Sequence, residues 1–99
     1  MTHNVNLTPC AKADLHNIWR YTVDTWSEVQ ADKYVRAVLD RCEWLATQPR
    51  IGKHRPDVAP DYYCFVQGQH VIFYLIREST IDIIGIPHRQ MDIVQFFDE

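Results

Sequence analysis

Two clusters of basic residues are the part of this sequence that could act on a charged partner. The first cluster, in a proline-rich stretch, holds Arg50, Lys53, His54 and Arg55, and the second is the pair His88 and Arg89. Histidines titrate near neutral pH and can transfer protons, while arginines can hold a phosphate. RNA cleavage needs both functions, so this inventory permits a nuclease. The same residue types also occur on surface loops that carry them only for solubility.

Other site chemistries have little support in the sequence. The five histidines show no H-x-x-x-H pair and no zinc-finger spacing with a cysteine, so we expect no metal site. The three cysteines lack the cationic neighbours that make a reactive thiolate, and we expect reduced core thiols at Cys10, Cys42 and Cys64. There is no glycine-rich phosphate loop and no serine nucleophile motif. We therefore predict no catalytic residue and no cofactor.

Length and composition describe a small folded protein. Its 99 residues suffice for a single domain, residues 1–99. No stretch approaches the length of an uncharged membrane span, and the polar start lacks the apolar run of a signal peptide. An odd number of cysteines does not form a paired disulfide framework, so we expect a cytoplasmic protein. The net charge of −3 disfavours a broad nucleic-acid surface, because phosphate binding needs a basic excess.

The elements that must position these residues begin with a short strand and an amphipathic helix. Residues 3–8 alternate in polarity as a strand does. Thr8 and Pro9 then suit the N-cap and the first turn of a helix. The apolar stripe of this helix follows helical spacing and consists of Leu15, Ile18, Trp19, Thr22 and Trp26.

A second helix is predicted directly after the first. Ser27 and Gln30 form a capping box at its start, and its apolar stripe extends over residues 31–46 and includes Leu39. Asp32, Arg36 and Asp40 lie four residues apart, and we expect weak ion pairs among them on the solvent face. Two adjoining amphipathic helices predict a helical hairpin that lies on a sheet.

The second half of the chain predicts that sheet. Residues 48–61 contain three prolines and follow neither period, so we expect a loop. Aromatic and β-branched residues predict strands at 62–67, 71–76 and 81–86, and their short connections require antiparallel pairing. The middle strand is apolar on both faces, so the face away from the helices needs a cover, either the tail at 91–97 or a partner. The predicted fold class is α+β: a strand, a helical hairpin, a three-stranded antiparallel meander and a short C-terminal tail.

Several of these segments together match the pattern of one known family. An apolar strand ends at Tyr74, an isoleucine-rich strand follows at 81–84, and His88 precedes the pair Met91 and Asp92. This order resembles the C-terminal signature of the ParE toxins of the ParE/RelE toxin–antitoxin superfamily. Residues 7–26 resemble the opening helix of that family, and residues 48–56 resemble its asparagine-proline-arginine loop, with glutamine in the asparagine place. The resemblance covers about residues 5–92.

The resemblance implies a toxin with the RelE/ParE-like fold that a cognate antitoxin from the same operon neutralises. ParE-type toxins bind DNA gyrase, block replication and arrest growth, and operator DNA would be reached only through the antitoxin. The candidate contacts with the target are Arg50, Lys53, Arg55, His88, Arg89, Met91 and Asp92. The candidate contacts with the antitoxin are the aromatic residues Trp26, Tyr34 and Phe65, since a contiguous apolar patch needs a partner.

Two alternatives to the gyrase inhibitor stay open. RelE-type relatives share the fold and cut mRNA on the ribosome, but Leu75 and Gly85 stand near the places where those nucleases hold phosphate with arginines. This departure weakens the cationic part of that mechanism, so we favour an inhibitor that binds over an enzyme that cleaves. The second alternative is a chain without toxicity that survives as an antitoxin-binding or DNA-repressing partner.

Overall fold

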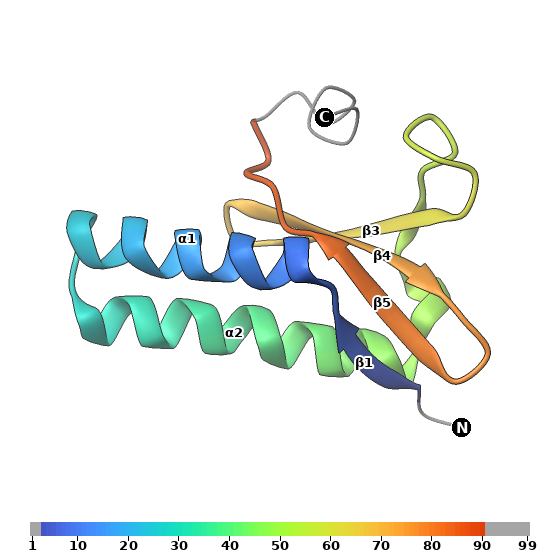
Figure 1. The fold of residues 1–99 in the computed structure, drawn as a ribbon, viewed down its shortest axis with the longest axis horizontal. Helices are drawn as coiled ribbons and strands as arrows, with labels where there is room; N and C mark the ends of the chain where they lie inside the picture. Colours follow the sequence, from blue (N-terminus) through green and yellow to red (C-terminus); the bar gives the residue numbers. More distant parts are fainter. Residues whose placement is uncertain (1–2, 91–99) are drawn as a thin grey trace.

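The chain folds as a helical hairpin packed on a five-stranded sheet. A computed structural model of the chain describes residues 3–90. Its elements, in order, are β1 (Asn4–Leu7), α1 (Pro9–Thr25), α2 (Glu28–Thr47), the 3-10 turn η1 (Pro49–Ile51), β2 (Lys53–His54), β3 (Tyr62–Gln67), β4 (His70–Ile76) and β5 (Thr80–Gly85). The two helices run side by side in opposite directions, as Figure 1 shows. Neither of these helices is both long and apolar enough to cross a membrane.

Both helices begin where the sequence predicts them. The Thr8 hydroxyl oxygen accepts a hydrogen bond from the backbone N–H of Ala11 at 3.3 Å, which satisfies one of the otherwise unpaired amides at the start of α1. The Ser27 hydroxyl oxygen does the same for the N–H of Gln30 at 3.1 Å at the start of α2. The Thr8 hydroxyl also donates to the carbonyl of Ile83 at 2.7 Å, which ties the start of α1 to β5.

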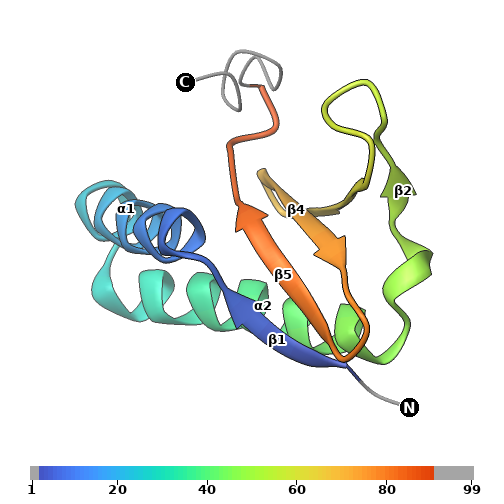
Figure 2. The same ribbon diagram turned by 45° about the vertical axis from the view of Figure 1, so that its right-hand side comes forward.

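The sheet has the order β1-β5-β4-β3-β2. The predicted antiparallel meander is confirmed, with each of its three strands within one residue of the predicted bounds. The N-terminal strand adds a feature that the sequence did not predict, because β1 pairs in parallel with β5, with Val5 opposite Ile81. The strand β5 therefore lies inside the sheet, and Figure 2 shows β1 and β5 alongside each other.

The core lies between the hairpin and the inner face of the sheet. Its largest fully buried side chains are those of Tyr74, Leu45, Ile72, Ile81, Ile83 and Val38. The predicted helical stripes are buried at most positions, but the structure corrects two of them. Trp26 is 75% exposed because it follows the last residue of α1, and Leu39, next to the buried Val38, is 36% exposed. Trp19 is only partly buried, and its indole N–H donates to the Asp32 carboxylate at 2.8 Å.

Two further predictions for the helices are wrong. Asp32, Arg36 and Asp40 are exposed as expected, but within residues 3–90 no ion pair joins them. Cys10 is exposed rather than part of the core, because it lies in the first turn of α1 outside the buried stripe of Ala11, Leu15 and Ile18. The other two cysteines are buried as free thiols.

The outer face of the sheet is covered in part by the segment between β2 and β3. Cys64, Val71 and Phe73 form a second buried cluster there, and Val58 and Tyr62 pack against it. The sequence predicted that the tail or a partner covers this face. Instead, the proline-rich segment of the same chain covers part of it through Val58.

Tyr74 connects the sheet to the segment after α2. Its side chain is fully buried, and its hydroxyl donates to the carbonyl of Pro49 at 2.6 Å and accepts from the N–H of Gly52 at 3.1 Å. A Cβ atom at position 52 would overlap this hydroxyl, so the close approach requires glycine. The predicted loop at 48–61 is therefore partly regular: it contains η1 and the short strand β2, which pairs with β3.

We predict that Tyr74→Phe destabilises the fold by about 1–3 kcal/mol, because the Pro49 carbonyl and the Gly52 amide lose a buried partner. Chemical denaturation followed by circular dichroism measures the change. Tyr21→Phe is the matched control, since Tyr21 is 68% exposed and should change stability by less than about 0.5 kcal/mol. Equal stability of Tyr74→Phe and the unmodified chain would show that the hydroxyl does not anchor this segment.

Candidate functional site

A groove runs between α1, the start of α2, the turn between β3 and β4, and the segment that follows β5. Its volume is about 600 Å³, which is in the range of ligand and peptide pockets. The lining residues that matter for its chemistry are Asp14, Tyr21, Trp26, Tyr34, His70 and His88. We call this feature the α1 groove.

One face of α1 forms a wall of the groove. Asp14, Ile18 and Tyr21 follow each other at spacings of four and three residues, so they lie on the same side of the helix. At a rise of about 1.5 Å per residue, the carboxylate end and the tyrosine end of this wall are about 10 Å apart. The groove therefore changes along its length from acidic to aromatic.

Asp14 fixes the segment after β5 to this wall. Its carboxylate accepts a hydrogen bond from the backbone N–H of Ile86 at 2.8 Å. Partial burial raises the pKa of Asp14 above its usual value, and the hydrogen bond from Ile86 offsets part of that rise. Within residues 3–90 no cation forms an ion pair with this carboxylate. The negative charge at the acidic end of the groove therefore has no cationic partner among the described residues.

A polar cluster forms the opposite wall. The Tyr34 hydroxyl lies 2.7 Å from Nδ1 of His70 and accepts from the N–H of Gln69 at 3.0 Å. The turn that brings them together needs Gly68, whose φ is +60° and whose missing Cβ leaves room for the Tyr34 ring. The His70 and His88 rings meet edge to face with centroids 5.4 Å apart. Burial, with a smaller contribution from His88, lowers the pKa of His70 to about 4, so this imidazole is neutral at pH 7.

Exposed apolar side chains lie around the turn that joins the two helices. Tyr21 is 68%, Trp26 75% and Val29 79% exposed. Tyr21 and Trp26 line the groove, and Val29 lies three residues after Trp26. Large apolar side chains gathered beside a groove are typical of a surface that binds a partner.

The structure brings together two of the three predicted antitoxin contacts. Trp26 and Tyr34 line the α1 groove. Phe65 lies elsewhere, with its ring 5.3 Å from that of Trp44 and with the Arg41 guanidinium 5.3 Å above it. Phe65 therefore packs on the far part of α2 and is separate from the groove.

The predicted target contacts do not gather in one site. His88 lines the α1 groove, whereas Arg50 lines a separate hollow of about 550 Å³ together with His3 and Arg77. Lys53 is exposed at the edge strand β2, and Arg89 is exposed with its N–H bonded to the carbonyl of Gln69. Met91 and Asp92 lie outside the described residues.

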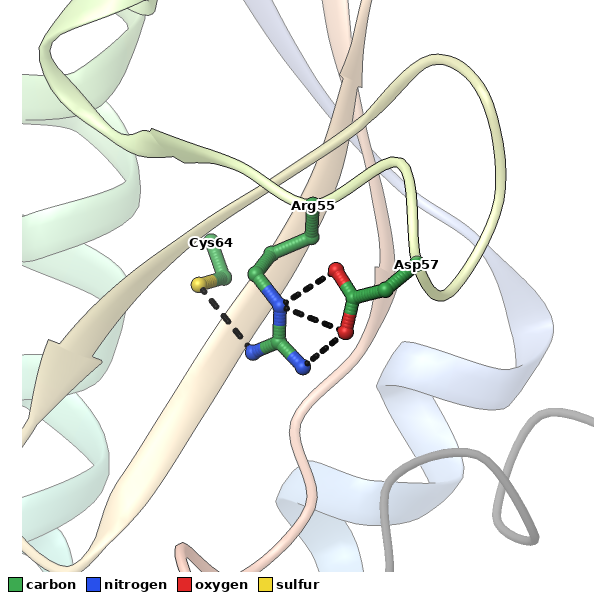
Figure 3. A network of polar contacts seen from close by, with 3 residues as sticks. All are labelled: Arg55, Asp57 and Cys64. Atoms are coloured by element: carbon green, nitrogen blue, oxygen red, sulfur yellow. Dashed lines mark hydrogen bonds and ion pairs between the residues drawn. The ribbon is translucent and has the colours of Figure 1, made fainter.

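Arg55 has a structural role that its sequence context did not reveal. Figure 3 shows its guanidinium between the carboxylate of Asp57, at 2.8 Å, and Sγ of Cys64, at 3.9 Å. The guanidinium also lies over the Phe73 ring of the outer cluster. The hydrogen bonds with Asp57 raise the pKa of Arg55 and lower that of Asp57. Arg55 thus holds the proline-rich segment against the sheet.

The residues of a nuclease are not assembled either. His54 is exposed, its Nε2 lies 2.7 Å from the carbonyl of Pro60, and its ring stacks on Tyr63, away from His88. Arg77 is bound to the Asp82 carboxylate at 2.6 Å. In the described part of the chain, no three histidine, cysteine or acidic side chains are grouped so that they could hold a metal ion.

Sequence reasoning missed Asp14 and His70 as members of the groove. For Asp14 a signal was present, because an acidic residue directly beside the buried Leu15 and four residues before Ile18 lies at the edge of an apolar stripe. For His70 the sequence held no such signal, since its neighbours Tyr34 and His88 come from α2 and from the segment after β5.

Comparison with known proteins gives consistent relatives. Residues 5–93 match the family described as "ParE toxin of type II toxin-antitoxin system, parDE". The protein Toxin ParE1 of Mycobacterium tuberculosis is 35% identical over 94 residues, which is 94% of this chain and 96% of the relative. Toxin ParE1 of Caulobacter vibrioides is 33% identical over 82 residues, which is 83% of this chain and 84% of the relative.

Solved structures share the fold at lower identity. The chromosomal ParDE toxin–antitoxin system of P. aeruginosa superposes with a TM-score of 0.76 at 20% identity, covering 88% of this chain and 96% of that one. The toxin–antitoxin complex RelBE2 of Mycobacterium tuberculosis gives 0.71 at 21% identity, covering 92% of this chain and 95% of that one. This similarity confirms the α+β fold class predicted from the sequence.

The lowered pKa of His70 predicts that acid destabilises the fold. The unfolded chain binds a proton near the ordinary value of 6.5, and the folded chain only near 4, so the stability contributed by the neutral ring is complete above 6.5 and lost as the pH falls toward 4. Between about pH 7.5 and about pH 5, and after allowance for solvent screening, we expect a loss of about 1 kcal/mol from this group.

Urea unfolding at both pH values measures this loss. His70→Asn keeps an acceptor for the Tyr34 hydroxyl but cannot titrate, so its stability should fall less than that of the unmodified chain. Equal losses in the two proteins would mean that His70 does not carry the acid sensitivity.

Proposed function

The chain belongs to the ParE toxin family of type II toxin–antitoxin systems, and on that premise we propose that it inhibits DNA gyrase by binding to it in the cytoplasm and is neutralised by a cognate antitoxin. The match to the family over residues 5–93 is the observation that carries the proposal. Both parts of the proposal concern macromolecular binding, which needs exposed surfaces rather than a catalytic centre.

The α1 groove supports the antitoxin as a partner. It combines a cavity of about 600 Å³ with the exposed rings of Tyr21 and Trp26. Burial of such rings at the centre of an interface contributes a large part of binding energy. The two structural relatives named above were solved as toxin–antitoxin systems, which is consistent with a partner on this fold. We propose that an antitoxin segment lies in the α1 groove and covers Trp26 and Tyr34.

The distribution of cations supports binding of the target rather than cleavage of RNA. Leu75 and Gly85 lie within β4 and β5, where they offer no charge to a phosphate. Arg55 and Arg77 are held by carboxylates of the same chain. We propose that the exposed cations Arg50, Lys53 and Arg89 contact gyrase, and that His88, Met91 and Asp92 contribute at the C-terminal end.

A gyrase supercoiling assay with the purified chain tests the function. We expect inhibition, or trapping of cleaved DNA, that the antitoxin encoded in the same operon relieves. The double charge reversal Arg50→Glu with Lys53→Glu should reduce the inhibitory potency at least about tenfold, because both side chains are exposed and neither forms an ion pair within residues 3–90.

The matched control is Lys12→Glu with Lys33→Glu, which changes the net charge equally on the helices and should leave the potency unchanged. A chain that has no effect on gyrase at high excess, and whose expression cleaves transcripts at the ribosome, is instead an RNA-cleaving toxin. A chain that leaves bacterial growth unaffected has no toxic activity.

We predict that Trp26→Ala weakens binding of the antitoxin at least about tenfold, because a large exposed ring beside a groove is a typical binding hot spot. Isothermal titration of the purified chain with the antitoxin gives the dissociation constant. Val66→Ala is the control, since Val66 is an exposed apolar residue of β3 outside the groove. If Val66→Ala weakens binding and Trp26→Ala does not, the antitoxin lies on the sheet rather than in the α1 groove.

A further inference from the structure

The α1 groove contains one carboxylate. Among the described residues that line it, Asp14 is the only acidic one, and none is a lysine or an arginine. His70 on the opposite wall is neutral at pH 7 because burial lowers its pKa to about 4. No lysine or arginine on the described residues comes within ion-pair distance of the Asp14 carboxylate. An occupant of the groove therefore meets an uncompensated negative charge.

The surroundings of Asp14 make its negative charge unfavourable. The carboxylate is partly buried, and only its Oδ2 atom has a hydrogen-bond partner within residues 3–90, the N–H of Ile86. Desolvation raises the pKa of Asp14, which means that the charged form is disfavoured relative to water. A cation placed beside the free Oδ1 atom would gain a charge-assisted hydrogen bond in a region of reduced dielectric.

The aromatic end of the groove suits the rest of such an occupant. Tyr21 lies two helical turns from Asp14 on the same face of α1, and Trp26 follows at the end of the helix. From the helical rise, Tyr21 is about 10 Å and Trp26 about 18 Å along the axis from Asp14. Apolar side chains, or the methylene stem of a lysine or arginine, can pack on these rings.

We propose that the α1 groove recognises a basic side chain, lysine or arginine, of the antitoxin, which pairs with Asp14 while apolar residues of the same antitoxin segment pack on Tyr21 and Trp26. This inference rests on the proposed function, since it takes the antitoxin as the occupant. The inference specifies how the antitoxin is recognised. The antitoxin segment carries its basic residue about 10 Å from the side chains that pack on Tyr21, which corresponds to about seven residues on a helix. Charge complementarity at this one point also gives specificity against antitoxins that lack the basic residue.

The substitution Asp14→Asn tests the inference. Asparagine keeps the size of the side chain and an oxygen that can accept the N–H of Ile86, so the segment after β5 stays in place while the charge is removed. We expect the dissociation constant for the antitoxin of the same operon to rise about tenfold. This loss is larger than that expected for an exposed ion pair at the rim of an interface and smaller than that for a fully buried one. Near-UV circular dichroism and thermal unfolding verify that the variant keeps its fold.

Asp40→Asn is the matched control, because it removes one negative charge from an exposed position of α2 outside the groove and should leave the dissociation constant unchanged. A double-mutant cycle then identifies the partner residue. Each lysine and arginine of the antitoxin is changed to methionine and measured against the unmodified chain and Asp14→Asn. One basic residue should lose its effect in the Asp14→Asn background, which is the signature of direct coupling.

The outcomes separate this inference from the proposed function. If the antitoxin binds the unmodified chain and Asp14→Asn equally well, the basic contact is overturned and neutralisation by the antitoxin stands. An antitoxin that does not bind the unmodified chain overturns both. If Asp14→Asn instead reduces self-association in sedimentation experiments and leaves antitoxin binding unchanged, the occupant is a second copy of the chain and the inference is overturned.

Discussion

The parallel pairing of β1 with β5 is the constraint on which the rest of the structure depends. It places the first four-residue strand beside the last one and makes β5 an inner strand of the sheet. Thr8 strengthens the link, because its side chain caps α1 and also bonds the carbonyl of Ile83. The start of α1 is thereby fixed next to the end of β5. The segment that follows β5 then has to pass along α1, where the Asp14 carboxylate binds the N–H of Ile86. The α1 groove results from this arrangement.

A second set of contacts converts the proline-rich segment from a loop into part of the scaffold. The buried Tyr74 hydroxyl holds both sides of η1, through Pro49 and Gly52. Arg55 then holds the following residues through Asp57 and covers Phe73 on the outer face of the sheet. These contacts use Arg55 for structure and leave Arg50 and Lys53 exposed. Cations that are close in sequence therefore have different roles.

The two surfaces differ in the charged side chains that they carry. The α1 groove combines aromatic side chains with one carboxylate, whereas the hollow around Arg50 combines apolar side chains with two arginines and a histidine. A toxin has to bind a target and an antitoxin, and two chemically different surfaces allow each partner to be recognised separately. The proposal assigns the aromatic groove to the antitoxin and the exposed cations to gyrase. A chain with a net charge of −3 can present a basic surface only locally, and Arg50 and Lys53 are exposed together around the short strand β2.

The sequence by itself determined both helices, the four longer strands and the family, but not η1 or β2. Helix caps at Thr8 and Ser27 and the alternation of strands 62–85 are local signals, because they depend on the hydrogen bonds and side chains of neighbouring residues. The tertiary structure alone decided which distant residues meet. Trp26 had the spacing of a core residue but lies in the turn where the stripe ends. Phe65 is aromatic like Tyr34 but packs against Trp44 instead of lining the groove. Asp14 and His70 line one groove because distant parts of the chain are packed together, and a proximity between residues so far apart leaves no periodic pattern in the sequence.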